Sequence, residues 1–217
     1  MVTEVDVFWK AALLTVVIFS MGVLVGYWLD TMRVEEIRSE YKEMDLEWGD
    51  ARLQALYYQI FKNTSNFCEP AINQNLEFAD RVYAEGVKLG QYEKINKFTP
   101  DLIIEKKKYV LLKLQFWLNC IHLKRLCDTP YINVVYFYSH HNLTTEDQVQ
   151  GAVLLDLKGA CGRKMMLIPL PVDLNLTTTN MIKEQYNIKK TPTILIDEKI
   201  KLEGLQTRDE LMKYLSC

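Results

Sequence analysis

The chain has 217 residues, of which 49% are hydrophobic and 25% are charged, and its formal net charge is -2. These values are ordinary for a folded protein of one or two domains. Such a balanced charge provides no polybasic surface, so the sequence does not predict a nucleic acid as partner.

An uncharged run from Ala11 to Leu29 lies between Lys10 and Asp30. At about 1.5 Å per residue, a helix of this length crosses the roughly 30 Å hydrocarbon core of a bilayer. Aromatic residues flank both ends of the run, as they do at membrane interfaces. The sequence therefore predicts a transmembrane anchor over residues 1–30. A cleaved signal peptide is the alternative, which the acidic start and the missing A-x-A site disfavour.

Two further features of the anchor concern its partners and its orientation. Gly22 and Gly26 have the spacing that lets two membrane helices approach closely, which predicts a homodimer through the anchor. Basic residues after the span favour a cytoplasmic C-terminal part. Five cysteines and three N-x-[ST] triplets, at Asn63, Asn142 and Asn175, favour the opposite side. We expect a single-pass membrane protein with an extracytoplasmic body.

For nearly a hundred residues after the span, apolar residues recur at helical spacing. A heptad-like seam predicts that the membrane helix continues outward to about Lys62. A second helix is expected at about 71–94, and a third from Pro100 to about Leu126, because proline is favoured in the first helical turn. Residues 31–129 are therefore expected to form a helical bundle whose apolar stripes serve packing.

The last ninety residues change to a pattern of alternating strands and helices. Strands are expected at 131–139, 164–175, 191–197 and 199–204, and helices at 143–162, 177–188 and 206–215. Pro169 and Pro171 argue for an early stop or a bulge in the second strand. The order is βαβαββα. A helical crossover makes the first two strands parallel, and a tight turn makes the last two a hairpin.

The segment "EQYNIKKTPTILIDEKIKLEG", with the helix after it, resembles the thioredoxin-like family over about Tyr131 to Leu215. The resemblance implies an α/β fold with a thioredoxin-like domain at 130–217, after the helical bundle and the transmembrane helix. It also implies that Pro192 is the cis-proline of that family and that Thr191 precedes it. The functional site would then lie where the first strand meets its helix, at "YFYSHHNLTTED".

Oxidoreductases of that family carry C-x-x-C at this junction, whereas this chain places Asn142 to Thr145 there. The usual dithiol exchange is therefore not expected. The candidate binding residues, for a ligand or a peptide strand, are His140, His141, Asn142, Thr144, Thr191 and Pro192. A capped helix start with surface histidines would explain these residues without a site. No metal and no other cofactor is expected, because adjacent histidines rarely share a metal ion.

None of the five cysteines has C-x-x-C or zinc-like spacing. Cys120 and Cys127 lie about 10.5 Å apart along one predicted helix, which is too far for a bridge. In an up-down-up bundle, Cys68 would lie near the end of that helix and within reach of either. We expect disulfides Cys68–Cys120 and Cys127–Cys161, with Cys217 free. Buried reduced thiols are the alternative.

Three classes of function fit this sequence. The first, which we expect, is a membrane-anchored thioredoxin-like module for interaction, scaffolding or folding assistance, with a protein or peptide partner and no enzymatic activity. The second is a divergent thiol-disulfide oxidoreductase that uses a cysteine outside the usual motif. The third is a subunit of a membrane complex that docks through its helical bundle. An insulin-reduction assay separates the first two, and co-purification in detergent tests the third.

Overall fold

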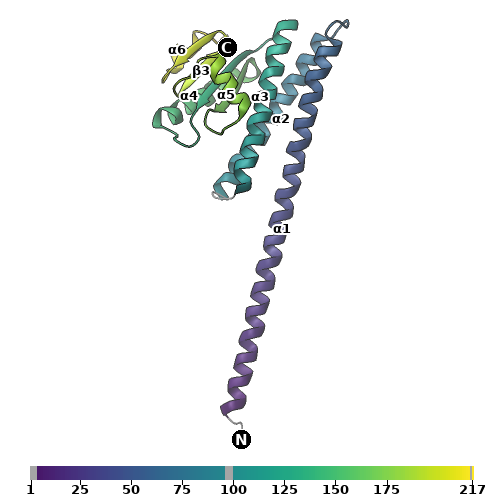
Figure 1. Ribbon diagram of the computed structural model, residues 1–217, viewed down its shortest axis with the longest axis vertical. Coiled ribbons are helices and arrows are strands. Elements are labelled where there is room, and N and C mark those ends of the chain that lie inside the picture. Colours follow the sequence, from purple (N-terminus) through teal and green to yellow (C-terminus); the bar gives the residue numbers. More distant parts are fainter. Residues whose placement is uncertain (1–3, 96–99, 216) are drawn as a thin grey trace. The chain divides into compact units, whose positions relative to one another are not determined.

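The computed structural model describes residues 4–95, 100–215 and 217 of a mixed α/β protein. The chain divides into two compact units, residues 1–43 and residues 44–217, and we call the second unit the body. The boundary predicted near residue 129 lies inside the body, because the helices before it share a hydrophobic core with the sheet after it. Figure 1 labels the helices and strand β3 along the chain.

Helix α1 (Glu4–Phe61) contains the run that the sequence predicts as an anchor. The segment Phe8–Leu29 is one uninterrupted apolar helix, long and apolar enough to cross a membrane, and its side chains are exposed throughout. Gly22 and Gly26 lie within it, and the homodimer through them stays a prediction. The last part of α1 belongs to the body, where Ala51 of the predicted seam is fully buried.

Helices α2 (Cys68–Ile95) and α3 (Pro100–Leu126) pack against each other and against the sheet. The apolar residues of α3 lie on every side of the helix, as is typical of a helix that packs between other elements. Helix α2 continues through Gly86. A Cβ atom on Gly86 would lie 2.2 Å from the Tyr109 hydroxyl, so only glycine lets this α3 side chain approach.

The sheet has the strand order β2-β1-β3-β4. Its strands are β1 (Ile132–Tyr138), β2 (Met165–Pro171), β3 (Thr193–Ile196) and β4 (Ile200–Glu203). The remaining elements are α4 (Thr145–Cys161), a 3-10 turn (Gly162–Lys164), α5 (Thr177–Gln185) and α6 (Arg208–Met212). β1 and β2 are parallel, whereas β3 runs antiparallel to both β1 and β4. A helical crossover thus joins the parallel pair, and a tight turn joins β3 to β4.

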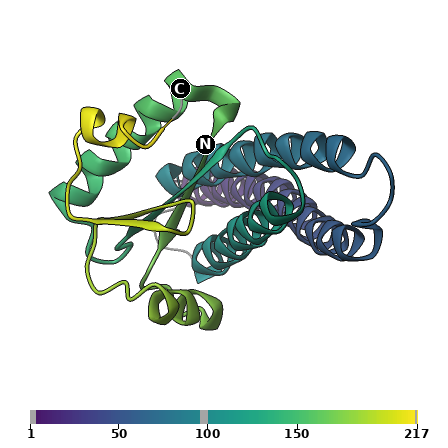
Figure 2. The ribbon, with the colours of Figure 1, turned by 90° about the horizontal axis from the view of Figure 1, so that it is seen from above.

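Alternate residues of β1 point to opposite faces of the sheet and build two separate cores. Val135 and Phe137 belong to the core that the sheet shares with α2, α3 and α5. Val134 and Tyr136 belong to the core that it shares with α4 and α6. The body is therefore layered, with helices on both sides of one sheet (Figure 2).

As the sequence suggested, β2 stops early: it ends at the second proline, Pro171, while Pro169 lies within the strand without a bulge. β2 is an edge strand that pairs with β1 as far as Pro171. Val172 donates its N–H to Tyr138 on β1, so the alternate residues Pro169 and Pro171 direct their backbone groups to the open edge. A proline at such a position removes no hydrogen bond of the ladder.

Two disulfides are present, and both predicted pairings are wrong. The bonds are Cys68–Cys127 and Cys161–Cys217, and Cys120 is a buried free thiol. Cys127 follows the last residue of α3 and faces the first residue of α2, whereas Cys120 lies two turns earlier and points into the core. The predicted Cys127–Cys161 bond fails because α3 and α4 lie on opposite faces of the sheet.

Candidate functional site

The junction between β1 and α4 is the place where the sequence suggested a site. Thr144 is the N-cap of α4 and forms a capping box with Asp147. The Thr144 hydroxyl accepts a hydrogen bond from the Asp147 N–H at 3.0 Å, and Asp147 Oδ2 accepts one from the Thr144 N–H at 3.2 Å. The Asp147 side chain is buried. The helix start is therefore fixed by its own first turn.

The loop before the cap is held by Asp173, which the sequence did not single out. Its carboxylate accepts hydrogen bonds from Ser139 Oγ at 2.7 Å and from the N–H groups of His140 and His141, both at 2.8 Å. Asn142 in turn donates its N–H to Ser139 Oγ at 3.0 Å. Burial acts to raise the pKa of Asp173, but these hydrogen bonds hold it below its usual range.

Thr191 and Pro192 face this junction from the loop before β3. The Thr191–Pro192 peptide bond is cis, as the resemblance implied. Thr191 Oγ1 donates to Asp147 Oδ2 at 3.3 Å, so one buried carboxylate connects Thr144 with Thr191. Asp147, which the prediction omitted, thus brings together two of the predicted site residues, Thr144 and Thr191. Pro192 itself is buried.

The two histidines lie at the edge of the junction and differ in their surroundings. Their rings form an edge-to-face pair with centroids 5.3 Å apart. His140 Nε2 lies 3.2 Å from the ammonium of Lys106, which also contacts Glu93 at 2.6 Å. Burial lowers the pKa of His140, and the Lys106 charge lowers it further. Among the described residues, no three His, Cys, Asp or Glu side chains are grouped closely enough to hold a metal ion.

These contacts mean that many polar groups of the junction are hydrogen-bonded to one another. Its polar side chains bond to one another through Asp147 and Asp173, and no sulfur lies among them. His141, Asn142 and Leu143 remain exposed at its surface.

Replacing Asp147 with alanine is expected to lower the free energy of unfolding by about 1–3 kcal/mol. The change removes the acceptor for Thr144 and Thr191 and leaves their donors unpaired beside a buried site. Urea unfolding of the full chain in detergent micelles measures the effect. The matched control is Asp156→Ala on the same helix, whose carboxylate forms an exposed ion pair with Arg208. Equal losses for the two variants would contradict the structural role of Asp147.

No protein-family model matches the sequence, and no curated protein matches it. Solved structures that resemble part of the chain include chloroplastic thioredoxin z, at 18% identity over 40% of this chain and 76% of that one, with a TM-score of 0.33. The germline-specific thioredoxin Deadhead of Drosophila melanogaster is 15% identical over 46% and 87%, with a TM-score of 0.33. A malarial protein is 16% identical over 39% and 92%, with a TM-score of 0.34.

Proposed function

We propose that this chain is a membrane-anchored protein with a thioredoxin-like domain that binds a protein or peptide partner without dithiol exchange. The element order from β1 to α6, the strand order of the sheet and the cis bond before Pro192 support the thioredoxin-like assignment. The cis-proline is the feature that the resemblance implied, and the element order is the one predicted from the sequence pattern. Partner binding would then take place at the surface formed by the β1–α4 junction and Thr191.

The state of the cysteines is the observation that carries this proposal. Four of the five sulfurs are in disulfides outside the junction. The fifth, Cys120, is fully buried, and burial raises the pKa of its thiol to about 12. Only a thiolate attacks a disulfide, and this thiol neither ionises readily nor meets a substrate. The oxidoreductase alternative therefore has no cysteine suited to start the reaction.

A partner would be held mainly through backbone groups. Among the described residues, no hydrogen bond involves the Thr191 N–H or C=O, whereas the neighbouring Pro192 carbonyl accepts from Gly204. An extended segment can pair with such groups as an added strand. Leu143, 47% exposed beside the junction, offers an apolar contact for one partner side chain. The recognition is thus of an extended polypeptide and requires no sulfur.

Anchoring and an extracytoplasmic body belong to the same proposal. The helix Phe8–Leu29 supplies the anchor. Two disulfides are typical of an oxidising compartment. The acceptor residues of all three N-x-[ST] triplets, Asn63, Asn142 and Asn175, are exposed and so accessible to glycosylation.

The full chain in detergent micelles is expected to reduce insulin no faster than a variant with all five cysteines replaced by alanine. It is also expected to bind S-carboxymethylated insulin B chain, an extended polypeptide whose thiols are blocked. Binding should change the amide chemical shifts of Thr191 and of residues 141–143. Leu143→Ser should weaken it several-fold, because a buried apolar contact is lost.

Leu155 provides the matched control for this experiment, because it is also an exposed leucine, 58% exposed in the middle of α4. Leu155→Ser should leave peptide binding unchanged. Insulin reduction that depends on a cysteine would overturn the proposal in favour of an oxidoreductase. Equal effects of Leu143→Ser and Leu155→Ser would place the binding surface elsewhere.

A further inference from the structure

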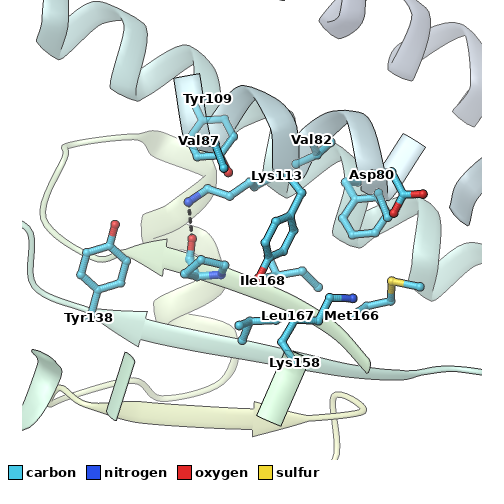
Figure 3. Close-up of a pocket in the computed structure, with 15 residues that line it drawn as sticks. Asp80, Val82, Val87, Tyr109, Lys113, Tyr138, Lys158, Met166, Leu167 and Ile168 are labelled. Carbon is cyan, nitrogen blue, oxygen red and sulfur yellow. Dashed lines mark hydrogen bonds between the residues drawn. The ribbon is translucent and has the colours of Figure 1, made fainter. Parts of the chain in front are cut away.

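A cavity of about 480 Å³ lies in the body between α2, α3 and the open edge of β2 (Figure 3). Its walls are mostly aliphatic and aromatic, with contributions from β1 and α4 as well. This volume falls in the range of roughly 300–1,000 Å³ that small-molecule sites occupy. The cavity shares Tyr138 with the segment that forms the β1–α4 junction, but it is lined by none of the candidate binding residues there.

The β2 edge explains why polar groups lie in this apolar cavity. Carbonyl groups of alternate residues on an edge strand have no partner strand and need other donors. Lys158 of α4 donates to the Met165 carbonyl at 2.7 Å, and Lys113 of α3 donates to the Pro169 carbonyl. Figure 3 shows the second of these bonds within the cavity. Two lysines therefore cover the edge where another strand would otherwise add.

When it is protonated, Lys113 has a carbonyl and an aromatic ring as neighbours but no acidic partner among the described residues. Lys113 is only 4% exposed, and its ammonium lies 4.5 Å from the centroid of the Tyr109 ring. Among the described residues, no carboxylate lies within 4 Å of this ammonium. The carboxylate that lines the cavity, Asp80, pairs with Arg163 at 2.5 Å. Burial lowers the pKa of Lys113 to about 7. An anion entering the cavity would meet an ammonium with two unused N–H groups.

We propose that this cavity binds an aliphatic carboxylate, with the head group on the Lys113 ammonium and the hydrocarbon chain against the apolar walls of α2 and β2. A carboxylate suits Lys113 better than Lys158, because Lys113 uses one N–H donor on the Pro169 carbonyl whereas Lys158 uses two, on the Gly162 and Met165 carbonyls. A doubly charged phosphate would leave excess negative charge in an apolar site. A neutral lipid would leave the buried ammonium without a partner. The proposal is independent of partner binding at the β1–α4 junction.

Photolabelling with a decanoate that carries a diazirine on its chain tests this site in the full chain, reconstituted in lipid nanodiscs. Proteolysis and mass spectrometry then locate the label. We expect it on the residues that line the cavity, from α2, α3 and β2. An excess of decanoate should suppress the label, whereas decanol, which has the same chain without the charge, should suppress it roughly tenfold less effectively, because a charge-assisted hydrogen bond is lost.

Lys113→Met keeps most of the side-chain volume and removes the charge, so it should reduce labelling of the cavity by roughly tenfold or more. The control is Lys189→Met, which replaces an exposed lysine outside the cavity. Thermal unfolding of both variants establishes that they are folded. Three results would each overturn the proposal: label confined to residues 8–29, equal competition by decanoate and decanol, or undiminished cavity labelling in Lys113→Met.

Discussion

Replacing Lys113 with methionine is expected to increase the stability of the protein, and the gain should disappear as the pH rises. The fall of the Lys113 pKa from 10.5 to about 7 reflects the cost of burying its charge. Converted at about 1.4 kcal/mol per unit, it corresponds to about 5 kcal/mol at most. Methionine fills nearly the same volume and has no charge to desolvate.

The pH dependence follows from the direction of this shift. Below about pH 7 the lysine is charged in both the folded and the unfolded chain, so the folded state bears the full penalty. Between about pH 7 and 10.5 the unfolded chain binds more protons than the folded one, and the stability of the natural protein therefore rises. The advantage of Lys113→Met is thus largest below pH 7 and is lost towards pH 10.5.

Urea unfolding of the full chain in detergent micelles, at about pH 6 and about pH 9, measures this difference. The groups that face Lys113 are Asp80, Tyr83, Tyr109, Tyr138 and Lys158. They are present in both proteins, so their titration largely cancels when the two stabilities are subtracted. Lys189→Met, at an exposed position, should change stability little at either pH. A Lys113→Met variant that is less stable than the natural protein, or equally favoured at both pH values, would contradict the assignment.

A buried lysine that destabilises its own fold suggests a use for the charge. Selection tends to keep such groups where they serve binding or catalysis, because a more stable apolar residue is one substitution away. Here the ammonium faces a cavity that opens between helices and a strand edge. Lys113→Met is therefore predicted both to stabilise the protein and to lose carboxylate labelling, because both effects come from removing the same buried ammonium.

The layered part of the body was largely predictable from local sequence patterns. The change from helical spacing to short β-branched runs located β1 to β4. Two threonines before an acidic first turn left the cap of α4 open between Thr144 and Thr145, and the structure has Thr144. The resemblance implied a cis-proline at Pro192, and the bond before Pro192 is cis. Each of these signals lies within a few residues of the feature it predicts.

Contacts between distant segments were the part that the sequence did not reveal. Asp173 follows β2 and reaches the loop after β1 only because parallel strands end at the same edge of the sheet. Asp147 was recognisable as part of a helix start, but not as the partner of Thr191, 44 residues away. Lys113 lies in an apolar helix whose stripe indicated packing alone. Its role depends on which carbonyl of β2 is left unpaired.

Removing the Cys68–Cys127 disulfide by replacing both cysteines with alanine is expected to lower the free energy of unfolding by about 4 kcal/mol. The bond joins residues 59 apart, and a closed loop of that size restricts the unfolded chain strongly. It also fixes the start of α2 to the end of α3, beside a small core that contains Tyr58 and Leu123. Hydrogen exchange should therefore accelerate most at these two helix ends.

The Cys161–Cys217 double variant is the matched comparison, because its loop of 56 residues is nearly the same length. A similar loss of stability is expected, but hydrogen exchange should accelerate in a different region of the body. This bond holds the chain after α6 against the end of α4, where Leu211 and Leu215 enter the second core. Exchange should therefore accelerate in α6 while α2 and α3 stay protected.

Peptide mapping without reduction tests the pairing of the cysteines directly. Cys120 should be recovered as the single free thiol, because it is buried against Asn75, whose amide lies 3.3 Å from the sulfur. Recovery of a peptide that links Cys68 to Cys120 would contradict the pairing. Five free thiols would remove the bonds altogether, and with them the main support for an oxidising compartment. If the mapping agrees, the two double variants should lose similar amounts of stability, because the two closed loops are of similar length. The regions where hydrogen exchange accelerates should differ, because each bond lies beside a different hydrophobic core.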